Sequence, residues 1–515
     1  MQLRTKWVAI ALIVLLLGSV GVAGVAFAQS DSSSSAAKSV ASSSLPAGLQ
    51  KKALSPAFMK YQQDKAAGKV QTRTVDGKGL GYVPSPLTLS RGTASSLMQA
   101  TSYPATYDLR TRHKVSPVED QGQCGSCWTF ATFGSLESYL LPGSATRYSE
   151  NNLKNLHDFN SGCCNGGNTL LSTAYLARWG TTRLDDFGQK IYAGPVTSTC
   201  DPYTTACTSP TGCGIAKHVQ NVYFLPLKQS LTDNSVIKSA LMTYGGVYAA
   251  FQWAGPSSHV TAIKTPYYNP STAAYYDKTR AGGNHAVTIV GWNDNYPKTS
   301  FSTTPPGNGA WLVKNSWGTS FGKSGYFYVS YYDINFGHVE NAVFTASSTS
   351  NYKTNYQYDP FGQEDSYGWA TDSTAYGANV FTATSTGTLK AVSFWTATAG
   401  TQYTAKVYVN PTASKPNSGT LVSTISGSVP YAGYYTKSLS TTVPLAKGQR
   451  FSVVIKFTTP GDGYPIPIQT WLSGFNDKVP ATPRGVTFVS HNGSTWYDLA
   501  ASDNYGVVNI HAFAS

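Results

Sequence analysis

The sequence predicts a chain of fold class α+β, in which a helix-bearing half and a strand-rich half precede a separate all-β antiparallel sandwich. Three observations predict this. Apolar residues at helical spacing occupy 127–140, and short strand-like segments bounded by Gly, Pro or Asn follow from residue 245. From about residue 349 the chain lacks cysteine and alternates in Thr-, Ser- and Tyr-rich segments with frequent turns, which is the pattern of a β-sandwich.

The amino terminus has the layout of a signal peptide over residues 1–28. Arg4 and Lys6 precede an apolar run from Trp7 to Leu17, and small residues lead to a small-x-small cleavage site after Ala28. The uncharged stretch 7–28 could span a bilayer if left uncut, but three glycines weaken its second half as an anchor. We therefore expect a secreted or cell-surface protein with no transmembrane segment after cleavage, in which disulfides can form.

Residues 29–101 differ in texture from the rest of the chain. They begin with a Ser-rich, low-complexity linker that has too few apolar residues to fold. An amphipathic helix is expected around 55–70, and a Pro-punctuated stretch occupies 81–92.

Composition excludes one broad class of partner. The formal charge is +13, but residues 1–100 hold 11 of the 38 Lys and Arg and only 3 of the 25 Asp and Glu. No dense basic stripe occurs later, which argues against nucleic-acid binding. Only 12% of residues are charged while Tyr, Ser, Thr and Gly are plentiful, as suits an extracellular, β-rich surface.

The domain predicted over 102–348 contains one clear helix and several strands. The helix over 127–140 ends at Pro142-Gly143. The expected strands are 245–251, 285–292, 309–317 and 325–332. The sandwich predicted over 349–515 has its expected strands at 388–398, 403–410, 420–429, 433–441 and 450–459.

Cys124 and Cys127 form a C-x-x-C, which is compatible with half a zinc site, a redox pair, or a nucleophile beside an unrelated disulfide cysteine. Zinc needs a second spaced pair of ligands, and the adjacent cysteines 163–164 have no gap. A redox pair would need a βαβ setting, which is absent from the sequence nearby. A nucleophile needs a base, an orienting group and an oxyanion donor.

Residues suited to these three roles occur elsewhere in the chain. His285 begins one apolar strand, and Asn315 ends another. Gln121 lies six residues before Cys127 and is a neutral donor for a developing oxyanion. A cysteine at a helix N-terminus near an imidazolium is stabilised as a thiolate.

Four motifs in this order, QGQCGSCW, GCCNGG, GGNHAVTIVGW and VKNSWGTSFGKSGYFYVS, resemble those of the papain-like cysteine peptidases over about residues 102–345. The resemblance implies a papain-like fold with a helical lobe and a β-barrel-like lobe. It implies that Cys127 is the nucleophile and His285 the general base and then acid. Asn315 would orient the imidazole, and Gln121 would donate to the oxyanion.

The resemblance also implies several supporting residues. Trp317 would shield the Asn315–His285 contact from water, and the backbone of Gly166 and Gly167 would pair with an extended substrate. The pocket for the second residue before the scissile bond would lie near Asn168, Thr169, Gly283 and residues 248–251.

Disulfides follow from the same resemblance, which implies that Cys124 pairs with Cys164. Four cysteines besides Cys127 then remain, and they allow three connectivities. We expect Cys163–Cys200, which resembles a second family bridge, and Cys207–Cys213, which would close a small loop. No metal site is expected.

The segments on either side of 102–348 are interpreted by the same likeness. A secreted enzyme with a free thiolate would need a pro-segment within 29–101, and residues 81–90 are the candidate to occupy the cleft. Residues 349–515 resemble the lectin-like domain of some prokaryotic surface peptidases, which implies a sandwich and leaves open a structural cation and a cell-surface glycan partner.

The sequence thus indicates an exported thiol-dependent endopeptidase that is made as a precursor, acts on protein or peptide substrates and needs no cofactor. Two alternatives remain open at this point. One is a glycan-binding surface adhesin that uses the peptidase fold as a scaffold, and the other is an acyl-transfer or processing enzyme with the same catalytic groups.

Overall fold

The computed structural model describes residues 45–92, 102–179, 183–184, 190–191, 193–210, 212–257 and 264–515. The predicted signal peptide and the whole of the Ser-rich linker, 29–44, lie outside these residues. Within the described parts of the chain, no helix is both long and apolar enough to cross a membrane. The amphipathic helix expected around 55–70 is α1 (Pro56–Ala66).

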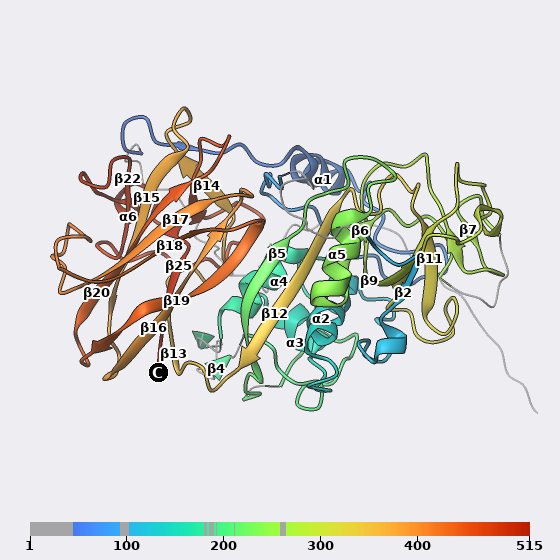
Figure 1. The fold of residues 1–515 in the computed structure, drawn as a ribbon, viewed down its shortest axis with the longest axis horizontal. Coiled ribbons are helices and arrows are strands. Elements are labelled where there is room, and N and C mark those ends of the chain that lie inside the picture. Colours follow the sequence, from blue (N-terminus) through green and yellow to red (C-terminus); the bar gives the residue numbers. More distant parts are fainter. Residues whose placement is uncertain are drawn as a thin grey trace, which may run out of the picture. The chain divides into compact units, whose positions relative to one another are not determined.

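Helix α2 (Cys127–Leu140) is the centre of the helical lobe, as its apolar sequence predicts (Figure 1). Nearly all of its side chains are buried. Two shorter helices, α3 (Glu150–Leu156) and α4 (Thr169–Ala177), pack beside it and begin at side-chain caps. Ser149 Oγ accepts from the Asn152 amide at 2.8 Å, and Asn168 Oδ1 accepts from the Leu170 amide at 2.9 Å. These caps fix where each helix starts.

The second lobe is built on a sheet whose strands run in the order β5-β12-β6-β9-β10-β11-β8-β7, with β2 paired to β9. All neighbours are antiparallel except β11 and β8. The bounds are β2 (Thr106–Asp108), β5 (Lys217–Phe224), β6 (Val247–Phe251), β7 (Tyr268–Asn269), β8 (Ala274–Tyr275), β9 (His285–Asn293), β10 (Ala310–Lys314), β11 (Tyr326–Ser330) and β12 (Glu340–Ser348). Helix α5 (Ser235–Tyr244) packs on this sheet.

The α+β class is confirmed. The second lobe, which was expected to be barrel-like, is an open sheet and does not close into a barrel. The reason is the pairing of β5, which continues outward to β19 (Ala432–Leu445) of the C-terminal region, with Ala432 opposite Phe224 and Tyr435 opposite Asn221. One continuous sheet therefore runs from β7 through the two-lobed domain and on through β19, β16 and β25 to β13.

The C-terminal region forms the predicted antiparallel sandwich. One of its layers is the extension of that continuous sheet, and the other is a six-stranded sheet of order β18-β17-β20-β15-β22-β23. The strands are β13 (Thr354–Tyr356), β14 (Asp365–Gly368), β15 (Thr374–Thr382), β16 (Gly387–Thr396), β17 (Gln402–Val409), β18 (Thr420–Ser428), β20 (Arg450–Thr458), β21 (Ile466–Gln469), β22 (Thr487–Ser490), β23 (Tyr497–Asp498), β24 (Val507–Val508) and β25 (Ile510–Ala514). The short helix α6 (Leu499–Ser502) precedes β24. An apolar core that includes Val407, Phe394 and Ile455 lies between the layers.

The segment before residue 93 packs against the sandwich at both of its ends. Strand β1 (Gln50–Lys51) pairs with β14, and Leu49 joins the sandwich core. At the other end the Ser90 amide donates to the Ala397 carbonyl at 2.8 Å. Between these points the segment crosses the two-lobed domain.

Candidate active site

Cys127 is the first residue of α2, and its side chain is completely buried. All seven cysteines of the chain are described, and Cys127 is the one without a disulfide. Its Sγ accepts a hydrogen bond from the backbone amide of Ala286, in β9, at 3.3 Å. The thiol at the start of the helical lobe therefore contacts the first strand residues of the other lobe.

His285 and Asn315 are brought together because β9 and β10 are antiparallel neighbours. His285 begins β9 and Asn315 directly follows β10. The imidazole Nε2 lies 2.9 Å from Asn315 Oδ1. The other ring nitrogen, Nδ1, is buried without a hydrogen-bond partner among the described residues. The amide thus holds one nitrogen of the ring and leaves the second for another group.

The contact between these two side chains is covered by Trp317. Its ring stacks on the His285 ring, with centroids 4.5 Å apart and planes at 17°, and is itself buried. Trp253 and Phe321 pack edge-on against the indole. Water is therefore excluded from the His285–Asn315 hydrogen bond, which is stronger in such a setting.

Burial sets the protonation of both groups in this structure. It raises the pKa of the Cys127 thiol to about 12, although backbone amides of Ala286 and Gly81 lower it. It lowers the pKa of His285 to about 4, although the bond to Asn315 raises it. The charged form is disfavoured for each group when it is removed from water. At neutral pH the pair is consequently a neutral thiol beside a neutral imidazole.

Gln121 is buried with its side-chain amide held in one orientation. Its Oε1 accepts from Ser316 Oγ at 2.6 Å, and its Nε2 donates to the Cys124 carbonyl at 2.8 Å. The same Nε2 donates to the carbonyl of Gly79 at 2.9 Å. The Gly79 carbonyl oxygen, in the chain's own N-terminal segment, therefore accepts the hydrogen bond that Gln121 Nε2 is expected to donate to an oxyanion.

Residues 79–83 run through the cleft next to these side chains. The Tyr82 amide donates to the Asn284 carbonyl at 3.0 Å, and the Val83 amide donates to the Gly167 carbonyl at 3.0 Å. The Gly167 amide in turn donates to the Gly81 carbonyl at 2.9 Å. Of the stretch 81–90 that was expected to occupy the cleft, residues 81–83 make these contacts, and Gly79 adds another. The segment is extended chain with one isolated bridge to the cleft wall, Tyr82 to Gly167, and not a regular strand.

Glycine is required at two places where this segment meets the cleft wall. A Cβ on Gly79 would lie 2.1 Å from the Cys124 carbonyl oxygen, and one on Gly81 would lie 2.0 Å from that of Gly125. Gly166, at φ +95°, approaches Gly81 from the other side. Such distances admit no side chain, so the segment can lie this close only because it is glycine-rich.

The side chain of Tyr82 fills a pocket beside the site. Its ring would lie 2.9 Å from a Cβ on Gly283, and it shares a core cluster with Tyr248 and Ala250. Asn168 Nδ2 donates to the Val83 carbonyl at 3.1 Å, and the Thr169 amide donates to the Glu340 carboxylate at 2.9 Å. Of the residues expected around this pocket, Gly283 lies against the Tyr82 ring, whereas Asn168 binds Val83 and Thr169 binds Glu340, so the pocket assignment stays a prediction.

Glu340 is a pocket residue that sequence reasoning missed. It is the first residue of β12 and is 1% exposed. Burial, and after it the charge of Glu340, raises the pKa of the Tyr82 phenol well above its usual value. The guanidinium of Arg91 interacts electrostatically with the same carboxylate. The signal in the sequence was a lone acidic residue at the start of a strand whose middle, Ala342 to Phe344, is apolar.

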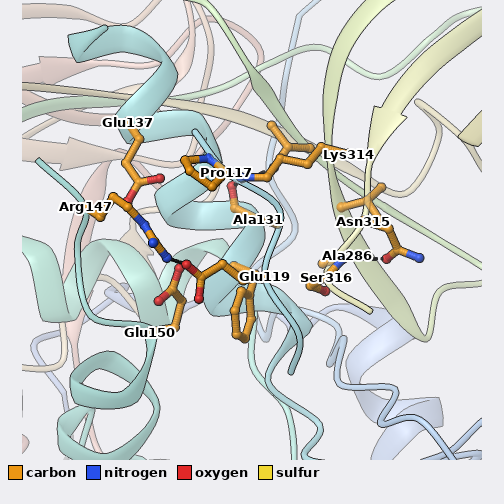
Figure 2. Close-up of a pocket in the computed structure, with 13 residues that line it drawn as sticks. Pro117, Glu119, Ala131, Glu137, Arg147, Glu150, Ala286, Lys314, Asn315 and Ser316 are labelled. Atoms are coloured by element: carbon orange, nitrogen blue, oxygen red, sulfur yellow. Dashed lines mark hydrogen bonds and ion pairs between the residues drawn. The ribbon is translucent and has the colours of Figure 1, made fainter. Parts of the chain in front are cut away.

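A cluster of buried charged groups lies behind the site and was also missed (Figure 2). Glu137 and Glu150 from the helical lobe and Lys314 from β10 line a cavity of about 10 Å³ that reaches Asn315. Burial raises the pKa of Glu150 to about 8 and that of Glu137 above its usual value, and it lowers that of Lys314. The lysine Nζ donates to Ser116 Oγ at 2.9 Å. The cavity has room for a single water at most.

The disulfides of the structure are Cys124–Cys164, Cys163–Cys207 and Cys200–Cys213. The first agrees with the sequence-based expectation. The expected bridges Cys163–Cys200 and Cys207–Cys213 are wrong. Cys200 and Cys213 instead join the two ends of the loop 200–213, and Cys207 lies within that loop. Asn155 Nδ2 binds the neighbouring Thr208 carbonyl at 2.7 Å, which holds this part of the loop against α3, near Cys163.

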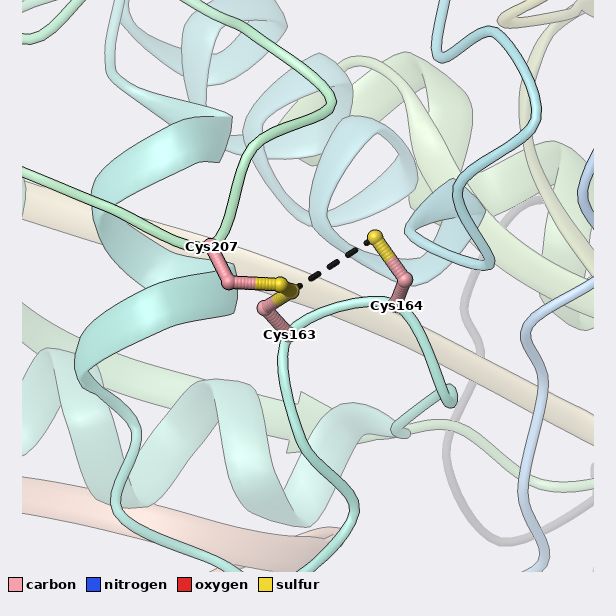
Figure 3. Close-up of side chains that lie close together, drawn as sticks. All are labelled: Cys163, Cys164 and Cys207. Atoms are coloured by element: carbon pink, nitrogen blue, oxygen red, sulfur yellow. Dashed lines mark hydrogen bonds between the residues drawn. A yellow bond between two sulfur atoms is a disulfide. The ribbon is translucent and has the colours of Figure 1, made fainter.

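Figure 3 shows the sulfurs of Cys163, Cys164 and Cys207 side by side. They form the one group of three candidate metal ligands among the described residues, and the Sγ atoms of Cys163 and Cys164 are 3.6 Å apart. Each of the three is in a disulfide. Since metal binding needs thiolates, this cluster links chain segments and is not a metal site.

Comparison with known proteins shows what the fold and the site resemble. Residues 103–347 match the model of the papain family of cysteine proteases, and residues 355–514 match that of a lectin-like domain. Digestive cysteine proteinase 2 of Homarus americanus is 33% identical over 243 residues, which are 43% of this chain and 60% of that protein. A cathepsin L-like peptidase of Aedes aegypti is 30% identical over 232 residues, covering 43% and 58%. The chain thus spans about three fifths of the length of the curated relatives it matches.

The fold of both domains together is also found in a solved structure. The cysteine protease and lectin-like domains of Cwp84, a surface layer associated protein of Clostridium difficile, align with a TM-score of 0.73 over 92% of this chain and 99% of that one, at 23% identity. A second form of the Cwp84 protease, after propeptide cleavage, aligns with a TM-score of 0.65 over 80% and 99%. At this level of identity the likeness concerns the fold.

Proposed function

Residues 103–347 belong to the papain family of cysteine proteases and residues 355–514 form a lectin-like domain, and from this premise we propose that the protein is an exported, thiol-dependent endopeptidase made as an inactive precursor. The observation that carries the proposal is the arrangement of Cys127, His285 and Asn315. A free thiol starts a helix at the cleft, and the nearby imidazole is held by an amide at one nitrogen only. Its protein or peptide substrates would bind where residues 79–83 now lie.

The proposed reaction begins when the Nδ1 of His285 takes the proton of the Cys127 thiol. The thiolate attacks the scissile carbonyl carbon, and the carbonyl oxygen becomes an oxyanion that Gln121 Nε2 stabilises. His285 then protonates the leaving amine, the C–N bond breaks, and an acyl-thioester remains. Water, deprotonated by His285, hydrolyses the thioester and restores the thiol. No cofactor is needed for these steps.

Inactivity of the precursor follows from what fills the cleft. Residues 79–83 occupy both the backbone-pairing position at Gly167 and the donor of Gln121. Burial also keeps the thiol and the imidazole neutral while the cleft is filled. Removal of the segment would admit water and substrate together, and a thiolate–imidazolium pair could then form.

The test is peptide hydrolysis by the chain after residues before 102 have been removed by proteolysis. Cys127→Ala should abolish hydrolysis, and Asn315→Ala should reduce kcat by at least roughly tenfold because the imidazole loses its orientation. His218→Ala is the matched control, since His218 lies away from the cleft and binds Asn351. Hydrolysis that survives Cys127→Ala would contradict the proposal.

Acyl transfer to an amine is the second reaction that these groups could perform, because the same thioester precedes it. Product analysis in the presence of added amines separates the two. Hydrolysis products alone support the peptidase, whereas amide products at low amine concentration would favour transfer.

The lectin-like domain supports a location at the cell surface and a role in glycan binding. In the adhesin alternative the protein binds glycans and does not catalyse hydrolysis. An adhesin should bind cells or glycans equally well with Cys127→Ala and show no hydrolysis after processing, so the hydrolysis experiment decides between these functions as well.

A further inference from the structure

Two connected hollows lie on the outer face of the six-stranded sheet of the sandwich. One, of about 220 Å³, is lined mainly by β15, β17, β20 and the loops at 417 and 492–496, and the other, of about 460 Å³, by β17, β18 and β20. Thr404 and Lys456 line both hollows. They therefore form one strip across the sheet.

Strand register explains how the strip is assembled. Thr404 lies opposite Lys456 on one side and opposite Ser426 on the other, and Lys456 lies opposite Tyr376. Residues directly opposite one another in a sheet share a face. The alternate residues, among them Ala405 and Ile455, point inward to the sandwich core. This row thus stands on the face that the other layer does not cover.

Aromatic rings stand along one end of the strip and are held in place. Trp496 Nε1 donates to Asn417 Oδ1 at 3.1 Å, and its ring meets that of Tyr376 edge-on at 6.4 Å. Gly493, at φ +74°, brings its loop so close that a Cβ would lie 2.9 Å from the Tyr376 ring. Tyr408 and Trp496 pack partly on a small apolar cluster that includes Val454. The three rings are consequently fixed without being fully buried.

The charge of the strip has one sign. Lys406 and Lys456 line it, and the described lining residues include no carboxylate. Asp372 interacts electrostatically with Lys456. Its carboxylate already accepts a hydrogen bond from the Thr374 amide at 2.9 Å and lies 3.0 Å from His491 Nε2. Hydroxyl and amide groups of Thr404, Ser426 and Asn417 line the strip as well.

We propose that this strip binds an acidic oligosaccharide, a sugar chain that carries carboxylate or phosphate groups. Aromatic faces pack on the apolar faces of sugar rings, while the hydroxyl and amide groups hydrogen-bond to sugar hydroxyls. The two ammonium groups pair with the anionic substituents. From Gln402 to Tyr408 the strip is about 20 Å long at ~3.3 Å per residue, which suits several linked sugar rings. The inference rests on the proposed glycan-binding role of the lectin-like domain and assigns its site.

Four polymers test the ligand class with the full chain carrying Cys127→Ala. The expected result is that polygalacturonate binds, the neutral glucan laminarin binds at least roughly tenfold more weakly, and added salt weakens the polygalacturonate complex. Inorganic polyphosphate, which has charge but no rings, should also bind more weakly. A phosphorylated dextran compared with polygalacturonate distinguishes the two anionic groups. Equal binding of polyphosphate or of laminarin would overturn the proposal.

Variants test the location. Lys456→Gln and Trp496→Ala should each weaken polygalacturonate binding by roughly tenfold, as expected for loss of one charge-assisted or stacking contact. The matched controls are Lys447→Gln, exposed in the turn after β19, and Tyr497→Ala, next to Trp496 but not in the lining. Unchanged binding in both test variants would overturn the site while leaving glycan binding in place. Failure to bind any of these polymers would overturn the site and leave peptide hydrolysis, measured separately, untouched.

Discussion

At the scale of single residues, the chemistry of the cleft is controlled by burial. Cys127 and His285 are neutral here because both are buried away from water, and not because any charged neighbour opposes their ionisation. The side chains that would make them a reactive pair are already in place. Uncovering the cleft is therefore expected to change their protonation without rearranging them.

Alkylation measures this directly. In the unprocessed chain, iodoacetamide should modify Cys127 at pH 7 more than roughly tenfold more slowly than in the processed chain, and the rate should rise with pH throughout the alkaline range, because a thiol with pKa about 12 supplies little thiolate. After processing, modification should persist below pH 7. Identical pH profiles for the two forms would contradict the role of the segment.

Glu150 predicts a second pH effect. Burial, and then the charge of Glu137, raises its folded pKa to about 8, above the usual value for a carboxyl group. The folded state therefore binds this proton more tightly than the unfolded state, and the associated stability is present at acid pH and lost as the pH rises towards 8.

Glu150→Gln should remove this loss. We expect the free energy of unfolding at pH 9 to rise by roughly 1–3 kcal/mol relative to the wild type, with little change at pH 5, measured by denaturant titration. Asp64→Asn, an acid with an exposed partner in α1, is the control and should show no such pH dependence. A variant less stable at pH 9 would refute the assignment.

Some site residues could be predicted from the sequence and others could not. Cys127, His285, Asn315, Gln121 and Trp317 could be placed because each lies in a local motif, and the structure brings all five together. Glu340 and Lys314 could not be assigned, since a buried charge depends on partners distant in the chain. The partner of Cys163 was misjudged for the same reason: spacing does not reveal which part of a loop folds back.

At the scale of elements, residues 79–83 fit into the cleft because Gly79 and Gly81 occupy the two positions closest to the cleft wall. Helix 127–140 and the strands at 285 and 310 could be predicted from local periodicity. The pairing of residues 79–83 with the cleft could be proposed only from the resemblance, and the pairing of β5 with β19 could not be predicted at all, because no local pattern specifies a partner more than 200 residues away.

Gly81→Ala tests the segment. Its Cβ would lie 2.0 Å from the Gly125 carbonyl oxygen, a backbone atom that cannot move away cheaply. The unprocessed variant should hydrolyse peptides at least roughly tenfold faster than the unprocessed wild type, since about 1.4 kcal/mol of lost docking suffices. Val75→Ala, in the same segment but 86% exposed, should behave as wild type. An inactive Gly81→Ala chain that becomes active on processing would contradict this.

At the scale of the whole molecule, the two domains share a sheet and not merely a surface. The join is tight at Gly433, where a Cβ would lie 2.1 Å from the Val222 carbonyl oxygen and φ is +153°. Backbone hydrogen bonds across β5 and β19 thus couple the unfolding of the domains, and the sandwich covers what would otherwise be a free strand edge.

Gly433→Ala should loosen this join. We expect a single calorimetric transition for the wild type, and for Gly433→Ala a Tm lower by several degrees, at ~2–4 °C per kcal/mol, with the transition separated into two. Gly214→Ala, where a Cβ would meet nothing within 4 Å, is the control. An unchanged, single transition in Gly433→Ala would show that the shared sheet does not couple the domains.

The anchoring of the N-terminal segment has a kinetic consequence. Its pairing with β14, the Lys52–Asp462 ion pair at 2.6 Å and the Ser90–Ala397 bond all lie on the sandwich and not at the cleft. If the proposed function holds, a cut after residue 92 is therefore expected to leave a nicked complex in which the N-terminal segment stays bound to the rest of the chain. Activity should then appear in a first-order dissociation step whose rate is independent of protein concentration. The contacts with the sandwich would set the lag between cleavage and the first turnover.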